Sequence, residues 1–182
     1  MFIGLFLLKN QNILFEGRLI IRMKHNKNIL IPIDFTIESL NTLKFALEEN
    51  KNEQLTVVLM YATHLSDSIT ELLFYSQYKI IQKLINQPFK DAINIINNTY
   101  ESTLQILKIE TFHGFHINAL KHFLDAHHIE MIYIPLNYRL RTNKNSFDPI
   151  PMLKKSTFKY KEVSWHTNNT TSHEDELIQL FK

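Results

Sequence analysis

The sequence has no cysteine and only three glycines among its 182 residues. The absence of cysteine excludes disulfide bonds, thiolate metal sites and cysteine nucleophiles, and it fits a reducing compartment such as the cytoplasm. The scarcity of glycine is more informative, because loops that hold a phosphate with backbone N–H groups rely on conformations that glycine adopts most readily. The three are Gly4, Gly17 and Gly114, so the whole segment from His116 to Lys182 contains none.

An excess of charge of one sign is also lacking. Lys and Arg number 20 and Asp and Glu number 18, which gives a net charge of +2. This balance provides no strong field for nucleic acid or for an anionic membrane surface. The sequence has neither a G-x-S-x-G nor an H-E-x-x-H motif, so it does not indicate an enzyme. We therefore expect no nucleic-acid partner and no catalytic residues.

No apolar run is long enough to cross a membrane. The first run, Met1 to Leu8, falls far short of the roughly 20 residues that a membrane helix needs. No basic residue precedes it and no cleavage site follows it, so it is a poor signal peptide. Met23 lies just before the first convincing strand and is a reasonable alternative start. We expect residues 1–22 to be a disordered or loosely packed extension and not a membrane anchor.

From Ile29 onward, strand-like and helix-like patterns alternate. This alternation predicts an α/β fold, namely an open, doubly wound, mostly parallel five-stranded sheet with helices on both faces. The predicted domain covers residues 25–166, and residues 167–182 form a polar linker and a short amphipathic tail. The expected strands are 29–34, 55–62, 104–112, 130–136 and 158–166, and the expected helical segments are 36–47, 69–85, 88–100, 117–128 and 148–156.

Four segments resemble a universal stress protein domain, and together they span most of residues 25–166. They are Lys27–Leu43 (KNILIPIDFTIESLNTL), Leu55–Ala62, the turn at Gly114 with the helix containing ALKHF, and Ile129–Tyr133 (IEMIY). The resemblance implies a fold of the adenine-nucleotide alpha hydrolase type, frequent homodimers formed through the last strand, and a role in stress response. It also implies two groups of proteins, of which one binds ATP. Asp34 matches the aspartate that contacts the nucleoside in that group.

The ATP-binding group carries a phosphate loop with the pattern G-x2-G-x9-G-[ST] after the fourth strand, and this sequence lacks it. Pro135, Tyr138, Asp148 and Pro149 stand at the positions of the three glycines and the hydroxyl residue. Proline has no N–H group, and an aspartate at a helix N-terminus repels an anion that would otherwise bind there. We therefore expect no cofactor, and we expect Asp34 to stabilise the following turn.

The alternative is a sensor of an adenine nucleotide or a small anion at the same edge. Arg139, Arg141 and Lys144 lie in the loop after the fourth strand, where arginine can bind a phosphate or carboxylate without glycines. Such a ligand would be contacted by Asp34, Tyr61, Asn137, Arg139 and Arg141. The simpler interpretation of these cations is a solvated loop.

Histidines are concentrated between His113 and His128, but their spacing does not predict a metal site. His122 and Asp125 can share a helix face. The remaining candidates, His113, His116 and His127, lack the paired spacing of known ligand motifs.

The last strand alternates in a mixed pattern that is typical of a sheet edge. We expect it to pair with a second copy, with Val163 and Trp165 in the interface. For Trp165, packing on the final helix or on the N-terminal extension is an equal alternative. The sequence thus predicts a cytoplasmic, homodimeric interaction module of a bacterial stress response that lacks ATP and acts on an unknown protein partner.

Overall fold

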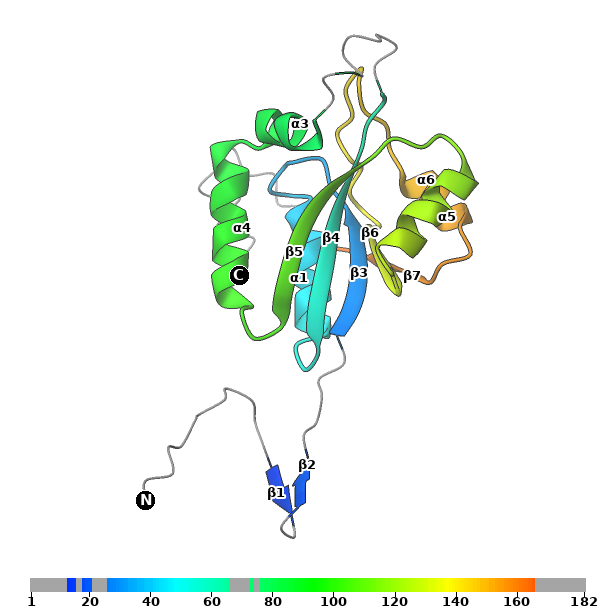
Figure 1. Cartoon of the computed structure of the whole chain (residues 1–182). Coiled ribbons are helices and arrows are strands. Elements are labelled where there is room, and N and C mark those ends of the chain that lie inside the picture. Colours follow the sequence, from blue (N-terminus) through cyan, green and yellow to red (C-terminus); the bar gives the residue numbers. More distant parts are fainter. Residues whose placement is uncertain (1–12, 16–17, 21–25, 66–72, 74–75, 166–182) are drawn as a thin grey trace.

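The computed structural model describes residues 13–15, 18–20, 26–65, 73 and 76–165. Its main feature is a five-stranded sheet with the order β5-β4-β3-β6-β7, in which all neighbouring strands are parallel (Figure 1). The predicted fold class is confirmed. The strands are β3 (Asn26–Pro32), β4 (Gln54–Ala62), β5 (Leu104–Phe112), β6 (Met131–Pro135) and β7 (Tyr160–Val163).

Helices cover both faces of this sheet. The helices are α1 (Leu40–Glu49), α3 (Gln77–Leu84), α4 (Gln87–Thr99), α5 (Ile117–Ala126) and α6 (Ile150–Lys155). Figure 1 shows α3 and α4 on one side of the sheet and α5 and α6 on the other. Two core layers result, one built with α1, α3 and α4 and one built with α5 and α6.

The central strands are apolar at nearly every position because helices cover both faces of the sheet. In β3, Ile29 and Ile31 belong to the first core layer and Leu30 to the second, and all three are fully buried. A strand with helices on both faces needs apolar residues at every position and not at alternate ones. The position of β3 at the centre of the sheet therefore agrees with its sequence.

Local signals set several helix boundaries. Asn86 accepts the N–H of Phe89 at 2.8 Å, and Pro88 lies in the first turn of α4, as predicted. The helix predicted over 69–85 is described as α3, which starts at Gln77 and whose N-terminus is capped by Ser76. Residues 66–72, within which the predicted segment begins, lie outside the described ranges.

A separate two-stranded antiparallel sheet is formed by β1 (Ile13–Phe15) and β2 (Arg18–Ile20). The sequence predicted no paired strands in residues 1–22. Within the ranges that the structure describes, none of the helices combines the length and apolar character needed to cross a bilayer. The predicted tail, residues 167–182, lies outside these ranges.

Candidate functional site

The candidate site lies where the carboxyl ends of β3 and β6 meet. The chain runs from β3 outward through β4 to β5 and then returns to the other side of β3 as β6. This reversal of strand order opens a crevice in doubly wound sheets, and ligands of such folds bind there. Asp34 follows β3, and the loop 136–149 follows β6.

Asp34 has its carboxylate fully occupied by groups of its own chain. Its Oδ1 accepts the backbone N–H of Thr36 at 3.0 Å and the Thr36 hydroxyl at 2.6 Å. Its Oδ2 accepts the Tyr138 hydroxyl at 2.6 Å and the backbone N–H of Arg141 at 2.7 Å. A carboxylate offers about four acceptor positions. The four donors therefore use the whole hydrogen-bonding capacity of this side chain.

The ring of Tyr138, whose hydroxyl donates to Asp34, packs against the ring of Trp165. The two rings lie 6.0 Å apart between centroids, and the Tyr138 hydroxyl is 2.9 Å from the Thr36 hydroxyl. Burial, together with the hydrogen bond to Asp34, raises the pKa of Tyr138 above its ordinary value. The raised pKa favours the protonated phenol, which donates its hydrogen to Asp34.

The turn that presents Asp34 contains a strained residue. Phe35 has a φ of 62°, a left-handed conformation that is unfavourable for a residue with a side chain. Its ring is buried against Tyr61 at 5.0 Å and Phe89 at 5.3 Å between centroids. Burial of a large aromatic ring offsets the backbone cost. The turn from Asp34 to Thr36 is thus fixed by the packing of the Phe35 ring in the core and by the hydrogen bonds of the Asp34 carboxylate.

The loop 136–149 is attached to the carboxyl end of β4. Thr63 and Ser146 form an antiparallel bridge. Asn145 accepts at its carbonyl the N–H of His64 at 2.7 Å and the hydroxyl of Thr63 at 2.6 Å. The N–H of Phe147 donates to the Ala62 carbonyl at 3.2 Å. These contacts hold the loop along the sheet edge in the position from which Tyr138 reaches Asp34.

The first turn of α6, where the loop ends, has its donors occupied or missing. Asp148 accepts the N–H of Ile150 at 2.9 Å, and the carbonyl of Pro149 accepts the N–H of Met152 at 3.0 Å. Pro149 and Pro151 have no N–H group. The sequence predicted Asp148 as the N-cap of a helix over 148–156, but α6 begins at Ile150 and its N-cap is Pro149, so Asp148 lies one residue before the cap.

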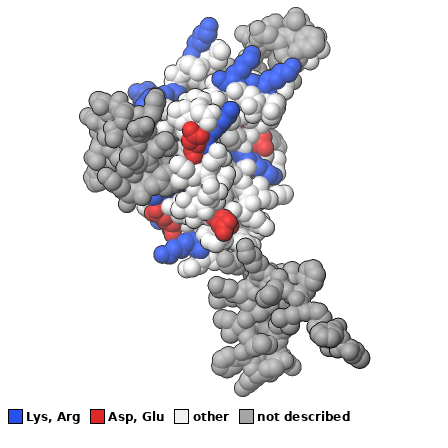
Figure 2. All heavy atoms as spheres, turned by 90° about the vertical axis from the view of Figure 1, so that its left-hand side faces the viewer, with Lys and Arg blue, Asp and Glu red and all other residues white. Residues whose placement is uncertain are grey.

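The cationic side chains of the loop 136–149 differ in their surroundings. Nη2 of Arg141 lies 2.5 Å from Oε1 of Glu38, so this guanidinium is neutralised by a carboxylate from the turn before α1. Arg139 and Lys144 are exposed. Figure 2 shows Lys and Arg side chains spread over one face of the molecule, with Asp and Glu side chains beside some of them.

Comparisons with known proteins address the fold. No family model and no curated protein match the sequence. Among solved structures, the universal stress protein UspA from Lactobacillus plantarum matches with a TM-score of 0.50 and 13% identity, over 75% of this chain and 97% of that one. The chain has a universal-stress-protein-like fold.

Two further structures match less well. A universal stress protein family member from Burkholderia pseudomallei gives a TM-score of 0.44 at 10% identity over 75% of this chain and 95% of that one. A universal stress protein in complex with cAMP gives a TM-score of 0.45 at 14% identity, over 78% of this chain and 98% of that one. At such identities the likeness concerns the fold alone.

Within this universal-stress-protein-like fold, the predicted ligand residues are only partly brought together. Arg141 contacts Asp34, but through its backbone N–H and not through its guanidinium. Tyr61 is only 5% exposed, and its hydroxyl accepts from Asn143 at 3.4 Å. Asn137 and Arg139 are exposed. The sequence identified Tyr138 as a misfit for phosphate but did not predict its contact with Asp34.

The two residues predicted for a dimer interface have different surroundings. Val163 is 1% exposed and its side chain belongs to the core of its own domain, so only the backbone of this residue is left for the interface, which stays a prediction. β7 is nevertheless an edge strand, as predicted. Trp165 packs against the same core and against Tyr138, and its indole N–H is buried without a hydrogen-bond partner among the described residues. The alternative for this residue was packing on the final helix or on the N-terminal extension, whereas the described contacts are with Tyr138 and the first core layer.

The histidines form no metal centre in the described part of the universal-stress-protein-like domain, where no group of three or more potential ligands occurs. His113 joins β4 to β5 instead. Its Nδ1 lies 3.0 Å from the Thr63 carbonyl and its Nε2 lies 3.0 Å from the Thr111 hydroxyl. His127 packs on the Phe123 ring at 4.5 Å between centroids.

Proposed function

We propose that this chain is a universal-stress-protein-like interaction module that binds no nucleotide and catalyses no reaction. In this proposal it forms a homodimer through β7 and contacts an unidentified protein partner in a cytoplasmic, bacterial stress response. The observation that carries the proposal is the pairing of Asp34 with Tyr138 and Arg141 at 2.6 and 2.7 Å. A nucleoside that used Asp34 would first have to break both contacts.

The occupied donors of α6 support the same proposal. A triphosphate needs several backbone N–H groups at a helix N-terminus or loop. Here Asp148 brings a negative charge and takes the Ile150 N–H, while two prolines remove further donors. Binding of phosphate would therefore meet repulsion at one end of the crevice and a filled carboxylate at the other.

Thermal unfolding with and without ligands tests the nucleotide part. A ligand at a hundred times its dissociation constant adds about 2.7 kcal/mol, which for a domain of this size raises Tm by about 5 to 10 °C. We expect no change in Tm with ATP, AMP or cAMP, each with and without magnesium. Magnesium alone is the control. A rise that disappears in Asp34→Asn would overturn the proposal.

A ligand sensor is the second candidate, favoured by the exposure of Arg139 and Lys144 beside the crevice. Neither cation forms an ion pair within the described ranges. A small anion held by them would raise Tm in the wild type but not in Arg139→Ala/Lys144→Ala. Inorganic phosphate and citrate are suitable probes. Equal shifts in both proteins would indicate a general salt effect and not this site.

The dimer part depends on the free edge of β7. Among the described residues β7 pairs only with β6. The carbonyl of Lys159 accepts the N–H of Ile132 in β6 at 3.0 Å, and the carbonyl of Val163 accepts the N–H of Leu136, directly after β6, at 2.7 Å. Because backbone groups alternate along a strand, the N–H of Glu162 points away from β6 toward the open edge.

Glu162→Pro therefore removes an outward donor while the contacts between β6 and β7 remain, since proline is tolerated on the open side of an edge strand. Glu162→Ala is the matched control, because both variants lose the ion pair with Lys154. We expect light scattering to show a dimer for the wild type and for Glu162→Ala, and a monomer for Glu162→Pro. A monomeric wild type would refute this part of the proposal.

A further inference from the structure

A basic hollow lies at the end of the sheet opposite to Asp34. It is lined by the start of β3, by α5, and by the residues around the starts of β6 and β7. Its volume is about 670 Å³, and it includes three ammonium groups against one carboxylate. The residues that matter here are Lys27, Lys121, Glu130, Met131, Phe158 and Lys159.

The three lysines are not equivalent. Lys27 donates to Asn50 at 2.8 Å and lies 3.7 Å from Glu53, so it is largely engaged within the domain. Lys121 and Lys159 are exposed, and neither side-chain ammonium group forms a hydrogen bond or an ion pair with another residue in the described ranges. The carboxylate of Glu130 accepts the N–H of Asn28 at 3.2 Å. The hollow therefore offers two unpaired cations to an anionic partner.

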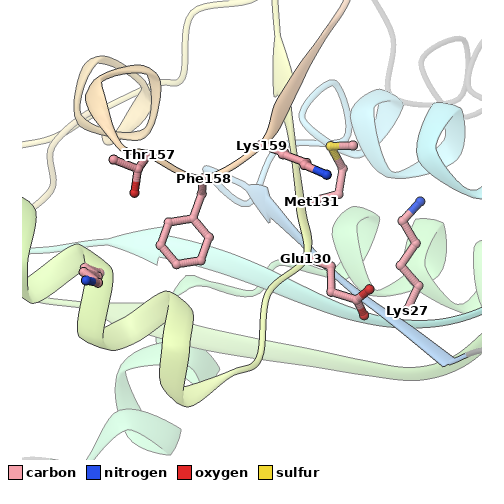
Figure 3. A pocket seen from close by; sticks show the side chains of 7 residues that line it. Lys27, Glu130, Met131, Thr157, Phe158 and Lys159 are labelled. Atoms are coloured by element: carbon pink, nitrogen blue, oxygen red, sulfur yellow. The ribbon is translucent and has the colours of Figure 1, made fainter.

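Apolar surface lies beside these cations. Phe158 and Met131 pack only partly into the two core layers. Figure 3 shows the amino groups of Lys27 and Lys159 and the carboxylate of Glu130 gathered around the chain at Met131, with the Phe158 ring close by. The chemistry that fits is a peptide with several carboxylates followed by large apolar side chains.

The chain itself carries such a segment. Glu174, Asp175 and Glu176 are followed by Leu177, Ile178, Leu180 and Phe181. The segment thus contains both kinds of group, carboxylates for the cations and large apolar side chains for the apolar surface of the hollow. Attraction between these three carboxylates and the exposed lysines is electrostatic complementarity of the sort that guides protein association.

The symmetry of the proposed dimer decides which copy supplies the segment. Two identical edge strands that extend one sheet across a two-fold axis run antiparallel. The partner's β7 then ends beside the start of this copy's β7, where Phe158 and Lys159 line the hollow. The nine residues 166–174 span up to about 30 Å when extended. In such a dimer the chain that leads to the partner's segment leaves β7 next to the hollow and is long enough for the segment to reach it.

We propose that the acidic segment 174–176 of one copy binds the basic hollow of the other, with Lys121 and Lys159 as its partners. This inference rests on the homodimer proposed above. It assigns the hollow to exchange of tails between copies, and it gives the tail a role in holding the dimer together.

Zero-length cross-linking of full-length protein tests this directly, because a carbodiimide joins a carboxylate only to an amine in contact with it. Unlabelled and ¹⁵N-labelled protein are mixed until the subunits exchange, and cross-linked peptides are identified by mass spectrometry. We expect peptides 174–176 to be joined to Lys121 and Lys159 in mixed-label pairs. Exposed lysines away from the hollow, Lys90 and Lys108, are the internal control.

Charge variants supply a second measurement. Lys121→Glu/Lys159→Glu should raise the dimer dissociation constant about tenfold at low salt, and the difference should shrink in high salt. Glu174→Gln/Asp175→Asn/Glu176→Gln should have the same effect, and the combined variant should show no further loss. Lys90→Glu/Lys108→Glu, which changes the net charge equally, should leave the constant unchanged.

The possible outcomes distinguish a failure of the proposed tail exchange from a failure of the proposed dimer. A dimer with tail cross-links confined to one copy, or spread equally over Lys90 and Lys108, overturns the exchange while the dimer stands. A monomer by light scattering overturns both. A dimer with mixed-label cross-links to Lys121 and Lys159 supports both.

Discussion

The hydroxyl of Tyr138 lies 2.6 Å from Oδ2 of Asp34, although 104 residues separate them in the sequence. One residue follows the central strand and the other follows the strand beside it, so the contact spans the point where the strand order reverses. In an open crevice this carboxylate would face solvent or a ligand. Here the loop after β6 supplies the partner from within the chain.

Tyr138→Phe tests how strongly this contact closes the crevice. Removal of the hydroxyl leaves a partly buried carboxylate without one of its donors, which costs about 1.5 to 3 kcal/mol for a hydrogen bond to a charged group. We expect Tm to fall by about 5 °C or more. Tyr78→Phe is the matched control, because Tyr78 is 71% exposed. Equal Tm values for the two variants would show that the contact contributes little.

The order and type of the main elements could be predicted because each carries a strong local signal. The run Leu104–Phe112 was predicted with the boundaries that the structure has, and Pro88 marked the start of α4. Periodicity and capping residues act over a few positions, so one sequence is enough to recognise them. The edge position of β7 followed from its mixed polar pattern.

The site was harder to predict because its contacts join distant residues. Tyr138 was recognised as incompatible with phosphate, but nothing local indicates that its hydroxyl reaches Asp34. Val163 was predicted in a dimer interface from its place in a mixed edge strand, and the sequence did not indicate that its side chain is buried within its own domain. Which face of an edge strand is covered depends on the helices around it. Here α1 contacts β7 through the ion pair of Glu49 with Lys161, and α6 contacts it through the ion pair of Lys154 with Glu162.

Gly114 is required by packing between β5 and α5. A Cβ atom at this position would lie 2.5 Å from Cβ of Ala119 and 2.7 Å from the Phe112 ring. Gly114→Ala should therefore destabilise the fold by about 1 to 3 kcal/mol, as overpacking does elsewhere. Urea unfolding measures the loss. Ala119→Gly in the same chain should recover part of it, and a Gly114→Ala protein as stable as the wild type would contradict the close approach.

His113 should make stability depend on pH. Burial lowers its pKa below the ordinary 6.5, so the unfolded chain takes up a proton at a higher pH than the folded one. The stabilisation is therefore complete above about pH 7 and is lost as pH falls through 6.5 toward the folded-state pKa. Unfolding free energies at pH 7.5 and 5.5 should differ more in the wild type than in His113→Gln. An equal difference would assign the pH dependence to the other histidines, which both proteins share.

Repair of the start of α6 alone should not create a nucleotide site. Asp148→Gly/Pro149→Ser restores a glycine and a hydroxyl residue and removes the carboxylate that takes the Ile150 N–H. Asp34, however, keeps its contacts with Tyr138 and Arg141 in this variant, so a nucleoside still finds its acceptor occupied. We expect Tm of the variant to be the same with and without ATP and magnesium.

Addition of Tyr138→Gly removes the phenol from Asp34, and only this triple variant should gain a nucleotide-dependent rise in Tm. A rise already present in the double variant would show that the phosphate end of the crevice, and not the Tyr138 contact, is what keeps nucleotide out.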